Sequence, residues 1–219
     1  MLLATQAQEF TSKETTNTAN TAYAQSPSSG KSNIAICGEL PVLTNIADRH
    51  HPERPELEAF IQHMFHKVHG ASITHFMPKL LSLRDSENTL RAVCGLRHAE
   101  NAALFLEHYL DAPIEEVLAV QVGHPVARHE ILEVGNLAVL EPACIRSLLA
   151  SVSVYLHSTD TKWAVFTGIT TLRNALRKLQ MPVQILGDAA LAQLPQTDQT
   201  HWGSYYEQQP KIMAIARFN

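Results

Sequence analysis

A carboxylate in the middle of an apolar segment has the clearest chemical potential in this sequence. Glu133 lies in "HEILEVGNLAVLEPACIRSLL", where apolar residues precede and follow it in alternation. Burial raises the pKa of a carboxyl group unless the group is paired, and a carboxylate with a raised pKa suits a general base that deprotonates an amine. A structural ion pair with Arg97 or Arg128 is the alternative role for Glu133.

Several cationic or amide side chains are placed where they could bind an anionic group. Arg97 ends a predicted strand, where a guanidinium can hold a carboxylate or phosphate through two hydrogen bonds; an exposed strand-end arginine is the alternative. Arg146 lies one turn into the helix predicted after Pro142, close to a helix start that attracts phosphate. Arg173 and Asn174 begin a later helix and could reach the same site. Solvation or helix capping is the alternative for these last three residues.

An aromatic cluster near the C-terminus could wall a binding site. Trp202, Tyr205 and Tyr206 all lie in "HWGSYYE", whereas aromatic residues make up only 6% of the whole chain. Outside a regular helix, such a cluster either fills the edge of a core or lines an apolar pocket. The pocket interpretation predicts that these three side chains contact a substrate.

The histidines and cysteines do not form patterns typical of a metal site or a catalytic thiol. His63, His66 and His69 lie opposite the apolar face of a predicted helix, so we expect them to face solvent rather than bind a metal ion. Cys144 lies at a helix start, which lowers a thiol pKa, but its motif contains no histidine to activate it. The three cysteines are widely spaced, which suits neither a disulfide framework nor a zinc site. We therefore expect no metal and a reducing compartment.

Length and composition bound the architecture. The 219 residues are 45% hydrophobic and 17% charged, which is enough for one sizeable core. Residues 1–33 are rich in Thr, Asn, Ser and Ala, so we expect a disordered tail followed by a single domain at 34–219. A net charge of −4 without a basic cluster argues against nucleic acid as a partner. The chain contains no run of about 18 apolar residues and no standard secretion signal, so we expect a soluble cytoplasmic protein.

Hydrophobic periodicity places the candidate residues on an ordered series of elements. The patterns predict a helix at 56–70, hairpin strands at 79–84 and 89–97, a short helix after Pro113, a strand at 131–139, a helix at 145–156, a strand at 162–170, a helix at 171–180, a strand at 182–187, a helical turn at 188–194 and a strand at 211–218. Strands with helices between them predict an α+β or α/β layered domain with a mixed central sheet.

The strand at 131–139 is predicted to run inside the sheet because both of its faces carry apolar residues. Simple alternation places Glu133 and Leu137 on one face and Asn136 on the other. Glu133 and Asn136 share a pocket only if a bulge intervenes, and Gly135 is a plausible position for one. The strand leads into a helix start, whose unpaired N–H groups can bind phosphate.

Four segments carry a resemblance to a known family. The stretches "CGLRHAENAALFLEHYLD", "EVGNLAV", "WAVFTGITTLRNALRKLQMP" and "HWGSYYEQQP" resemble the bacterial thermostable hemolysin family over residues 56–217. The order of elements looks like the acyltransferase fold of the GNAT superfamily. In that fold the central strand splays from its neighbour, and an acyl thioester cofactor lies in the gap. The resemblance therefore implies a GNAT-like domain and an acyl thioester site.

The sequence is more distantly similar to the acyl-homoserine-lactone synthases, GNAT-fold enzymes that take their acyl group from an acyl carrier protein. Arg97 and Glu133 match the Arg and the Glu of that family's motifs, whereas Gly135 and Asn136 stand where the synthases carry a Ser-Arg pair. The segment "LEPACIRS" also lacks the glycines of the usual pyrophosphate loop. The resemblance implies acyl-CoA or the phosphopantetheine of an acyl carrier protein as donor, and the choice between them stays open.

These observations lead to three functional hypotheses. The first is an acyltransferase that moves an acyl group to an amine or hydroxyl of a small acceptor, with Glu133 and Arg97 as the catalytic pair. The residues expected to bind the thioester are Asn136, Leu137, Ala138, Val139, Arg146, Arg173 and Asn174, and those expected to bind substrate are Trp202, Tyr205 and Tyr206. The second is a cytolytic protein acting directly on membranes, although the chain shows no strongly amphipathic basic helix. The third is a non-catalytic GNAT-like binding module.

Overall fold

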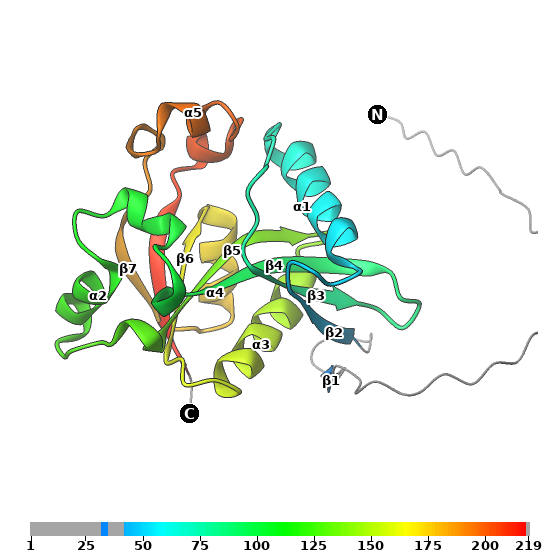
Figure 1. Ribbon diagram of the computed structural model, residues 1–219, viewed down its shortest axis with the longest axis horizontal. Helices are drawn as coiled ribbons and strands as arrows, with labels where there is room; N and C mark the ends of the chain where they lie inside the picture. The colour runs from blue at the N-terminus through cyan, green and yellow to red at the C-terminus, as the bar shows by residue number, and fades with distance from the viewer. Residues whose placement is uncertain (1–31, 35–41, 218–219) are drawn as a thin grey trace, which may run out of the picture. The chain divides into compact units, whose positions relative to one another are not determined.

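A mixed β-sheet organises the part of the chain that the computed structural model describes, residues 32–34 and 42–217. These residues belong to one compact unit, Lys31–Asn219. The strands are β1 (Ser32–Ile34), β2 (Val42–Ala47), β3 (Lys79–Arg84), β4 (Leu90–His98), β5 (Ile131–Val139), β6 (Trp163–Gly168), β7 (Val183–Asp188) and β8 (Lys211–Ala216). Their order across the sheet is β1-β2-β3-β4-β5-β6-β8-β7, and the β5–β6 pair is parallel while the other pairs are antiparallel (Figure 1).

The helices connect these strands in the predicted order. They are α1 (Arg54–His69), α2 (Ile114–Val122), α3 (Cys144–His157), α4 (Thr170–Lys178) and α5 (Gln196–Gln199), and two 3₁₀ helices matter for the site, η2 (Phe105–Tyr109) and η5 (Tyr205–Gln208). The α+β class with a mixed sheet is thereby confirmed. The predicted tail at 1–33 lies outside the described residues except for Ser32 and Asn33, which belong to β1. A disordered tail and a single domain from residue 34 therefore stay predictions.

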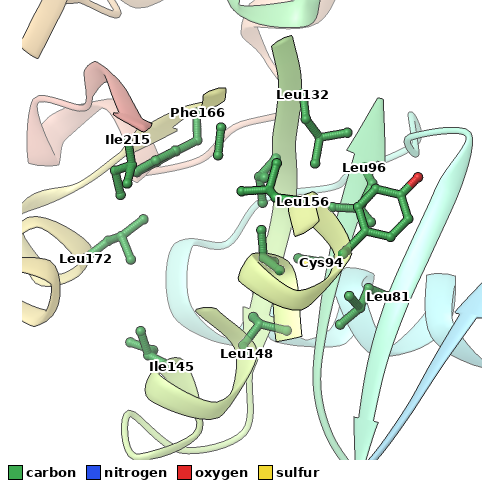
Figure 2. Close-up of a cluster of buried hydrophobic side chains, with 14 of the residues drawn as sticks. Leu81, Cys94, Leu96, Leu132, Ile145, Leu148, Leu156, Phe166, Leu172 and Ile215 are labelled. Carbon is green, nitrogen blue, oxygen red and sulfur yellow. The ribbon is translucent and has the colours of Figure 1, made fainter. Parts of the chain in front are cut away.

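The two faces of the sheet are covered by different helices. Helices α3 and α4 pack on one face, where Leu148 and Leu156 of α3 meet strand side chains such as Leu96 and Cys94 (Figure 2). Helix α1 covers the β2–β4 half of the opposite face, while α2 and the turns before it cover the β6–β8 half. Trp202 packs against both of these clusters and so bridges the two halves of the second face.

A β-bulge in β5 changes which side chains share a face. Val93 of β4 pairs with Ala138, but Gly95 pairs with Gly135, so β5 holds one extra residue at this point. Asn136 takes up the irregularity with a φ of +46°, a conformation that asparagine tolerates better than most residues. Leu137 consequently packs against the α3 and α4 cluster, away from the face of Glu133. Simple alternation had placed the two on one face, and that prediction is wrong because the bulge shifts the period by one.

Helix α1 ends where its sequence predicts. Leu57, Ile61 and Met64 are buried along one side, as the apolar spacing requires. Gly70 then adopts the left-handed conformation with φ +65°, and its N–H donates to the carbonyl of His66 at 2.8 Å. This stop directs the following segment, residues 72–77, back across the sheet toward β3.

Candidate active site between β5 and β6

The strands β5 and β6 pair over three residues and then part. Ile131, Leu132 and Glu133 pair with residues 163–165 of β6, and no further β5–β6 pairing occurs in the described part of the chain. A cavity of about 250 Å³ is lined by residues of both strands at and beyond this point, 133–139 of β5 and 166–168 of β6. The sheet itself therefore provides a slot that opens on one side of β5.

The segment 72–77 forms one wall of this cavity and is held tightly to the sheet. The Asn136 Oδ1 accepts a hydrogen bond from the Met77 N–H at 3.0 Å, and its Nδ2 donates to the carbonyl of His75 at 3.2 Å. A Cβ added to Gly95 would come within 2.7 Å of the Met77 side chain, and one added to Gly135 within 2.4 Å. The Met77 side chain therefore packs directly against the backbone of both glycines. Asn136 therefore has a structural role in holding this wall, and its role in cofactor binding stays a prediction.

The aromatic segment, residues 198–206, contributes to the lining of the cavity and is hydrogen-bonded to the end of α1 and the residues after it. The His69 carbonyl accepts the Ser204 N–H at 2.9 Å, and the His201 carbonyl accepts the Ser72 N–H at 2.7 Å. Gly203 has φ +51°, and a Cβ there would come within 2.0 Å of the His69 carbonyl oxygen. Only glycine allows this close approach, so the segment is fixed in place by its backbone.

Glu133 is buried, and each of its carboxylate oxygens accepts one backbone hydrogen bond. Its side chain is 3% exposed, its Oε2 accepts the Phe105 N–H at 3.0 Å and its Oε1 accepts the Leu106 N–H at 2.8 Å. Burial raises the pKa of Glu133, and the two backbone N–H groups and the charge of Arg97 only partly oppose this rise. Each carboxylate oxygen carries two lone pairs, so each keeps one acceptor position beyond its backbone bond.

Arg97 is close to Glu133 without forming a direct hydrogen bond to it. The Arg97 Nη1 lies 3.9 Å from Glu133 Oε2, which allows electrostatic attraction but exceeds hydrogen-bond range. The same nitrogen donates to the carbonyl of Ala103 at 3.1 Å. The guanidinium lines the cavity and has five N–H groups, so it retains donors for an anionic ligand.

Three tyrosines, Tyr109, Tyr205 and Tyr206, are among the residues that line the cavity. Tyr205 forms a side-chain hydrogen bond with Thr167, near the end of β6. The hydroxyls of Tyr109 and Tyr206 lie 2.5 Å apart, and burial raises the pKa of both phenols. Both tyrosines therefore stay protonated at neutral pH.

One histidine prediction is wrong. His63 and His66 are exposed as expected, but His69 is half-buried, lines the cavity and stacks edge-on against Tyr205 at 5.3 Å. Its Nδ1 is buried without a hydrogen-bond partner, and burial lowers the pKa of its imidazole. His69 is the last residue of α1. The position of its side chain is set by packing against the aromatic segment, and the apolar spacing of the helix does not predict this.

The structure brings together most of the predicted site residues, but not all. The predicted residues that line the cavity are Arg97, Glu133, Asn136, Leu137, Ala138, Val139, Trp202, Tyr205 and Tyr206. Three others are not among the lining residues: Arg146 is exposed on α3, Asn174 is exposed on α4, and Arg173 donates to the Thr170 hydroxyl at 2.8 Å. The missed lining residues include Tyr109, His69 and the segment 72–77. "FLEHYLD" carried a weak signal for Tyr109, since it lies within one of the family-like segments.

The described residues offer neither a cluster of metal ligands nor a membrane-spanning helix. Within residues 32–34 and 42–217, no three His, Cys, Asp or Glu side chains are grouped so that they could hold a metal ion. Over the same ranges, no helix combines the length and the apolar character needed to span a bilayer.

Comparison with solved structures shows the fold. The structure of FeeM, an N-acyl amino acid synthase from uncultured soil microbes, superimposes with a TM-score of 0.55 at 12% identity and covers 81% of this chain and 91% of that chain. The acyl-homoserine-lactone synthase LasI gives a TM-score of 0.55 at 10% identity, with 81% of this chain and 90% of that chain covered. TofI in an apo form gives 0.52 at 10% identity, with coverages of 80% and 90%. The α+β fold is therefore the GNAT-like fold of these synthases, as the order of elements predicted.

Comparison with sequence families identifies the chain more closely. No curated protein matches the sequence. The family model described as thermostable hemolysin matches residues 47–218, which includes every strand from β3 to β8 and all of the cavity wall. The likeness seen in the motifs around Glu133 and Trp202 is thereby confirmed, and the chain belongs to the thermostable hemolysin family.

Proposed function

We propose that this protein is an acyltransferase that binds an acyl thioester in the slot between β5 and β6 and transfers the acyl group to a small amine or hydroxyl acceptor. The observation that carries the proposal is the parting of β5 and β6 directly after Glu133, which opens a cavity containing a buried carboxylate and a cavity-facing guanidinium. The names of the synthases that share the fold agree with this reaction class. The predicted cytoplasmic location is part of the proposal.

The donor side of the site uses the free edge of β5. Beyond Glu133, the edge of β5 that faces β6 has no strand partner within the described residues. Unpaired backbone N–H and C=O groups at a strand edge can bind the amides of an extended ligand, as an added strand would. The pantetheine arm shared by coenzyme A and acyl carrier proteins has two such amides, so we place it along residues 136–139.

The acceptor side of the site lies near Glu133 and Arg97. A carboxylate whose pKa is raised by burial can accept a proton from an amine in the transition state, either directly or through one water. The spare lone pair on each Glu133 oxygen provides the position for that proton. Arg97 can orient an acceptor that carries a carboxylate or another anionic group. The apolar and aromatic walls formed by Phe105 and Trp202 shield the reaction from water.

The direct test is acyl transfer by the purified full-length protein. The protein is incubated with acyl-CoA donors and acyl carrier protein donors of graded chain length, together with a panel of amines and amino acids. The expected result is a product whose mass equals that of the acceptor plus the acyl group, with release of an equivalent of free thiol. If no donor and acceptor combination yields product or free thiol above the rate without protein, the acyltransferase proposal is wrong.

One observation favours a second candidate, a non-catalytic binding module. Both oxygens of Glu133 accept backbone hydrogen bonds and only 3% of the side chain is exposed, as a purely structural carboxylate would require. This candidate predicts binding of acyl-CoA or acyl carrier protein with no turnover. Isothermal titration with a donor that shows binding, followed by no thiol release over many hours, would support it over the enzyme.

The family name raises the possibility of direct membrane lysis, and vesicles test it. If the protein acts as an acyltransferase, purified protein alone should not release a trapped dye from anionic or neutral lipid vesicles. Any lysis of cells would then depend on an acyl donor and its lipid-like product. The measurement is dye fluorescence at increasing protein-to-lipid ratio, with a pore-forming peptide as positive control. Rapid release at a low ratio without any donor would contradict the enzyme proposal.

A further inference from the structure

We propose that the Tyr109–Tyr206 hydroxyl pair donates a hydrogen bond to the carbonyl oxygen of the bound thioester as negative charge develops on that oxygen. This inference rests on the proposed function and assigns a specific role within it. The two tyrosines come from distant parts of the chain, Tyr109 from η2 and Tyr206 from η5, and both line the cavity.

The tyrosine pair has two O–H donors, and the hydrogen bond between the two hydroxyls uses only one of them. Each phenol carries one O–H proton and can also accept. The hydroxyls of Tyr109 and Tyr206 lie 2.5 Å apart, so one proton is used between them and the other O–H remains. No other group in the described part of the chain accepts a hydrogen bond from either hydroxyl. Buried polar groups rarely go without partners, so the remaining O–H is available to a ligand in the cavity.

The more exposed member of the pair is the one placed to donate. Tyr109 is 5% exposed, whereas Tyr206 is half-buried at the cavity wall. With Tyr109 donating to Tyr206, the Tyr206 proton is free to point into the cavity. A hydroxyl that already accepts one hydrogen bond becomes a stronger donor in turn. Burial raises the pKa of both phenols, so neither loses its proton in the neutral range.

The surroundings hold this pair in a fixed relation to Glu133. The N–H groups of Phe105 and Leu106 in η2 bind the Glu133 carboxylate, and Tyr109 belongs to the same short helix. Tyr206 is packed edge-on against Trp202 at 5.6 Å. A donor held in place before the reaction costs no reorganisation in the transition state, which is where such electrostatic stabilisation is largest.

The step balances in atoms and charge. The acceptor nitrogen, losing its proton toward Glu133, attacks the thioester carbon and forms the C–N bond, while the carbonyl π electrons move onto oxygen. The Tyr206 O–H stabilises that oxyanion by a hydrogen bond and keeps its own proton. Collapse of the tetrahedral intermediate restores the C=O bond and breaks the C–S bond. The departing thiolate takes up the proton that the acceptor nitrogen lost.

The test compares three single Tyr→Phe variants with the wild-type protein, using the donor and acceptor found active. Tyr206→Phe removes the donor, so kcat should fall about 10²–10³-fold with little change in KM for the donor. Tyr109→Phe leaves the Tyr206 O–H but removes its polarising partner, so the fall should be about tenfold. Tyr155→Phe is the matched control, because the Tyr155 hydroxyl lies 2.9 Å from His98 Nε2 and Tyr155 does not line the cavity, so this variant should stay close to wild type.

A double variant and a folding measurement make the result decisive. Tyr109→Phe with Tyr206→Phe should be no slower than Tyr206→Phe alone, because the pair acts as one donor, whereas multiplying losses would overturn the inference. Rates are expressed per folded molecule from thermal unfolding of each variant. If the wild type transfers acyl groups but Tyr206→Phe retains its kcat, this inference fails while the proposed function stands. If the wild type transfers none, the proposed function fails and takes the inference with it.

Discussion

Two glutamates bind the backbone of η2 and its flanking residues, Glu133 from β5 and Glu107 from within η2 itself, yet their surroundings shift their pKa values in opposite directions. Glu133 accepts the N–H groups of Phe105 and Leu106 inside η2, and Glu107 accepts those of Leu104 and Ile114 at 2.8 and 3.0 Å on either side of it. Each carboxylate therefore receives two backbone hydrogen bonds. They differ in burial, since the Glu133 side chain is 3% exposed and that of Glu107 17%, and in the neighbouring arginine.

Arg128 binds Glu107 directly, whereas Arg97 does not bind Glu133. The Arg128 nitrogens lie 2.7 and 2.9 Å from the two Glu107 oxygens, in a bidentate pair. Burial alone would raise the pKa of Glu107, but these bonds and the two backbone donors outweigh it and lower the pKa to about 2. At Glu133 the guanidinium stays 3.9 Å away and burial prevails, so the pKa is raised. A directly bound guanidinium suits a structural carboxylate, and its absence suits one that exchanges protons.

The largest expected difference between variants at Glu133 and Glu107 is in the rate of acyl transfer. Glu133→Gln keeps the size of the side chain and removes the base, so transfer should fall about 10²–10⁴-fold. Glu107→Gln is the matched control, because Glu107 also accepts two backbone N–H groups but does not line the cavity. It should keep nearly full transfer per folded molecule. The measurement is initial rate of thiol release at saturating donor.

Two outcomes would break this part of the comparison. Full transfer by Glu133→Gln, together with loss of transfer when Arg97 is replaced by Gln, would make Glu133 structural and Arg97 essential. An equal loss in Glu107→Gln would show that the integrity of η2, rather than the Glu133 carboxylate, controls the rate.

The next largest difference between the two variants is in the free energy of unfolding. Here the Glu107 variant should be affected more than the Glu133 variant. A glutamine at either position offers one acceptor oxygen, and its NH₂ group faces a backbone N–H that then has no partner, at a cost of about 1–3 kcal/mol. Glu107→Gln also breaks the bidentate Arg128 pair, so it should lower the free energy of unfolding by more than Glu133→Gln does. Urea unfolding of both variants measures this. A larger loss for Glu133→Gln would mean that Glu133 carries the main structural load.

The smallest effect is the pH dependence, and its sign differs between the two residues. The folded pKa of Glu107 is near 2 and its ordinary value is 4.5, so its contribution to stability is complete above pH 4.5 and is lost as pH falls toward 2. The folded pKa of Glu133 lies above 4.5, so its contribution is complete below 4.5 and is lost as pH rises through the folded value.

Carbon NMR of the glutamate side-chain carboxyls resolves the two titrations directly, with the Gln variants serving for assignment. We expect the Glu133 signal to titrate above pH 4.5 and the Glu107 signal well below it. Acyl transfer should decline on the acid side with the Glu133 titration, since the base must be ionised. A Glu133 midpoint below 4.5 would show that burial does not control the pKa of this carboxylate.

The sequence by itself determined the elements and several of the chemical groups. Alternation around Glu133 predicted a buried carboxylate in a central strand, and the density of aromatics around Trp202 predicted a cavity wall. Both inferences depend on local pattern, because a residue's burial follows from the period of its own strand or the composition of its own segment. The end of α1 at Gly70 was equally local, since only a short stretch of backbone must adopt the left-handed turn.

Tertiary structure alone decided how those groups are used. The arginine bound to Glu107 comes from 21 residues away and the backbone donors of Glu133 from 27 and 28 residues away, so no local period could reveal either set of partners. The bulge at Asn136 turned Leu137 to the other face, and the contact with Gly203 brought His69 into the cavity. Pairing across the fold sets the protonation of a carboxylate and the direction of a side chain, because both depend on what the rest of the chain places within a few ångströms of them.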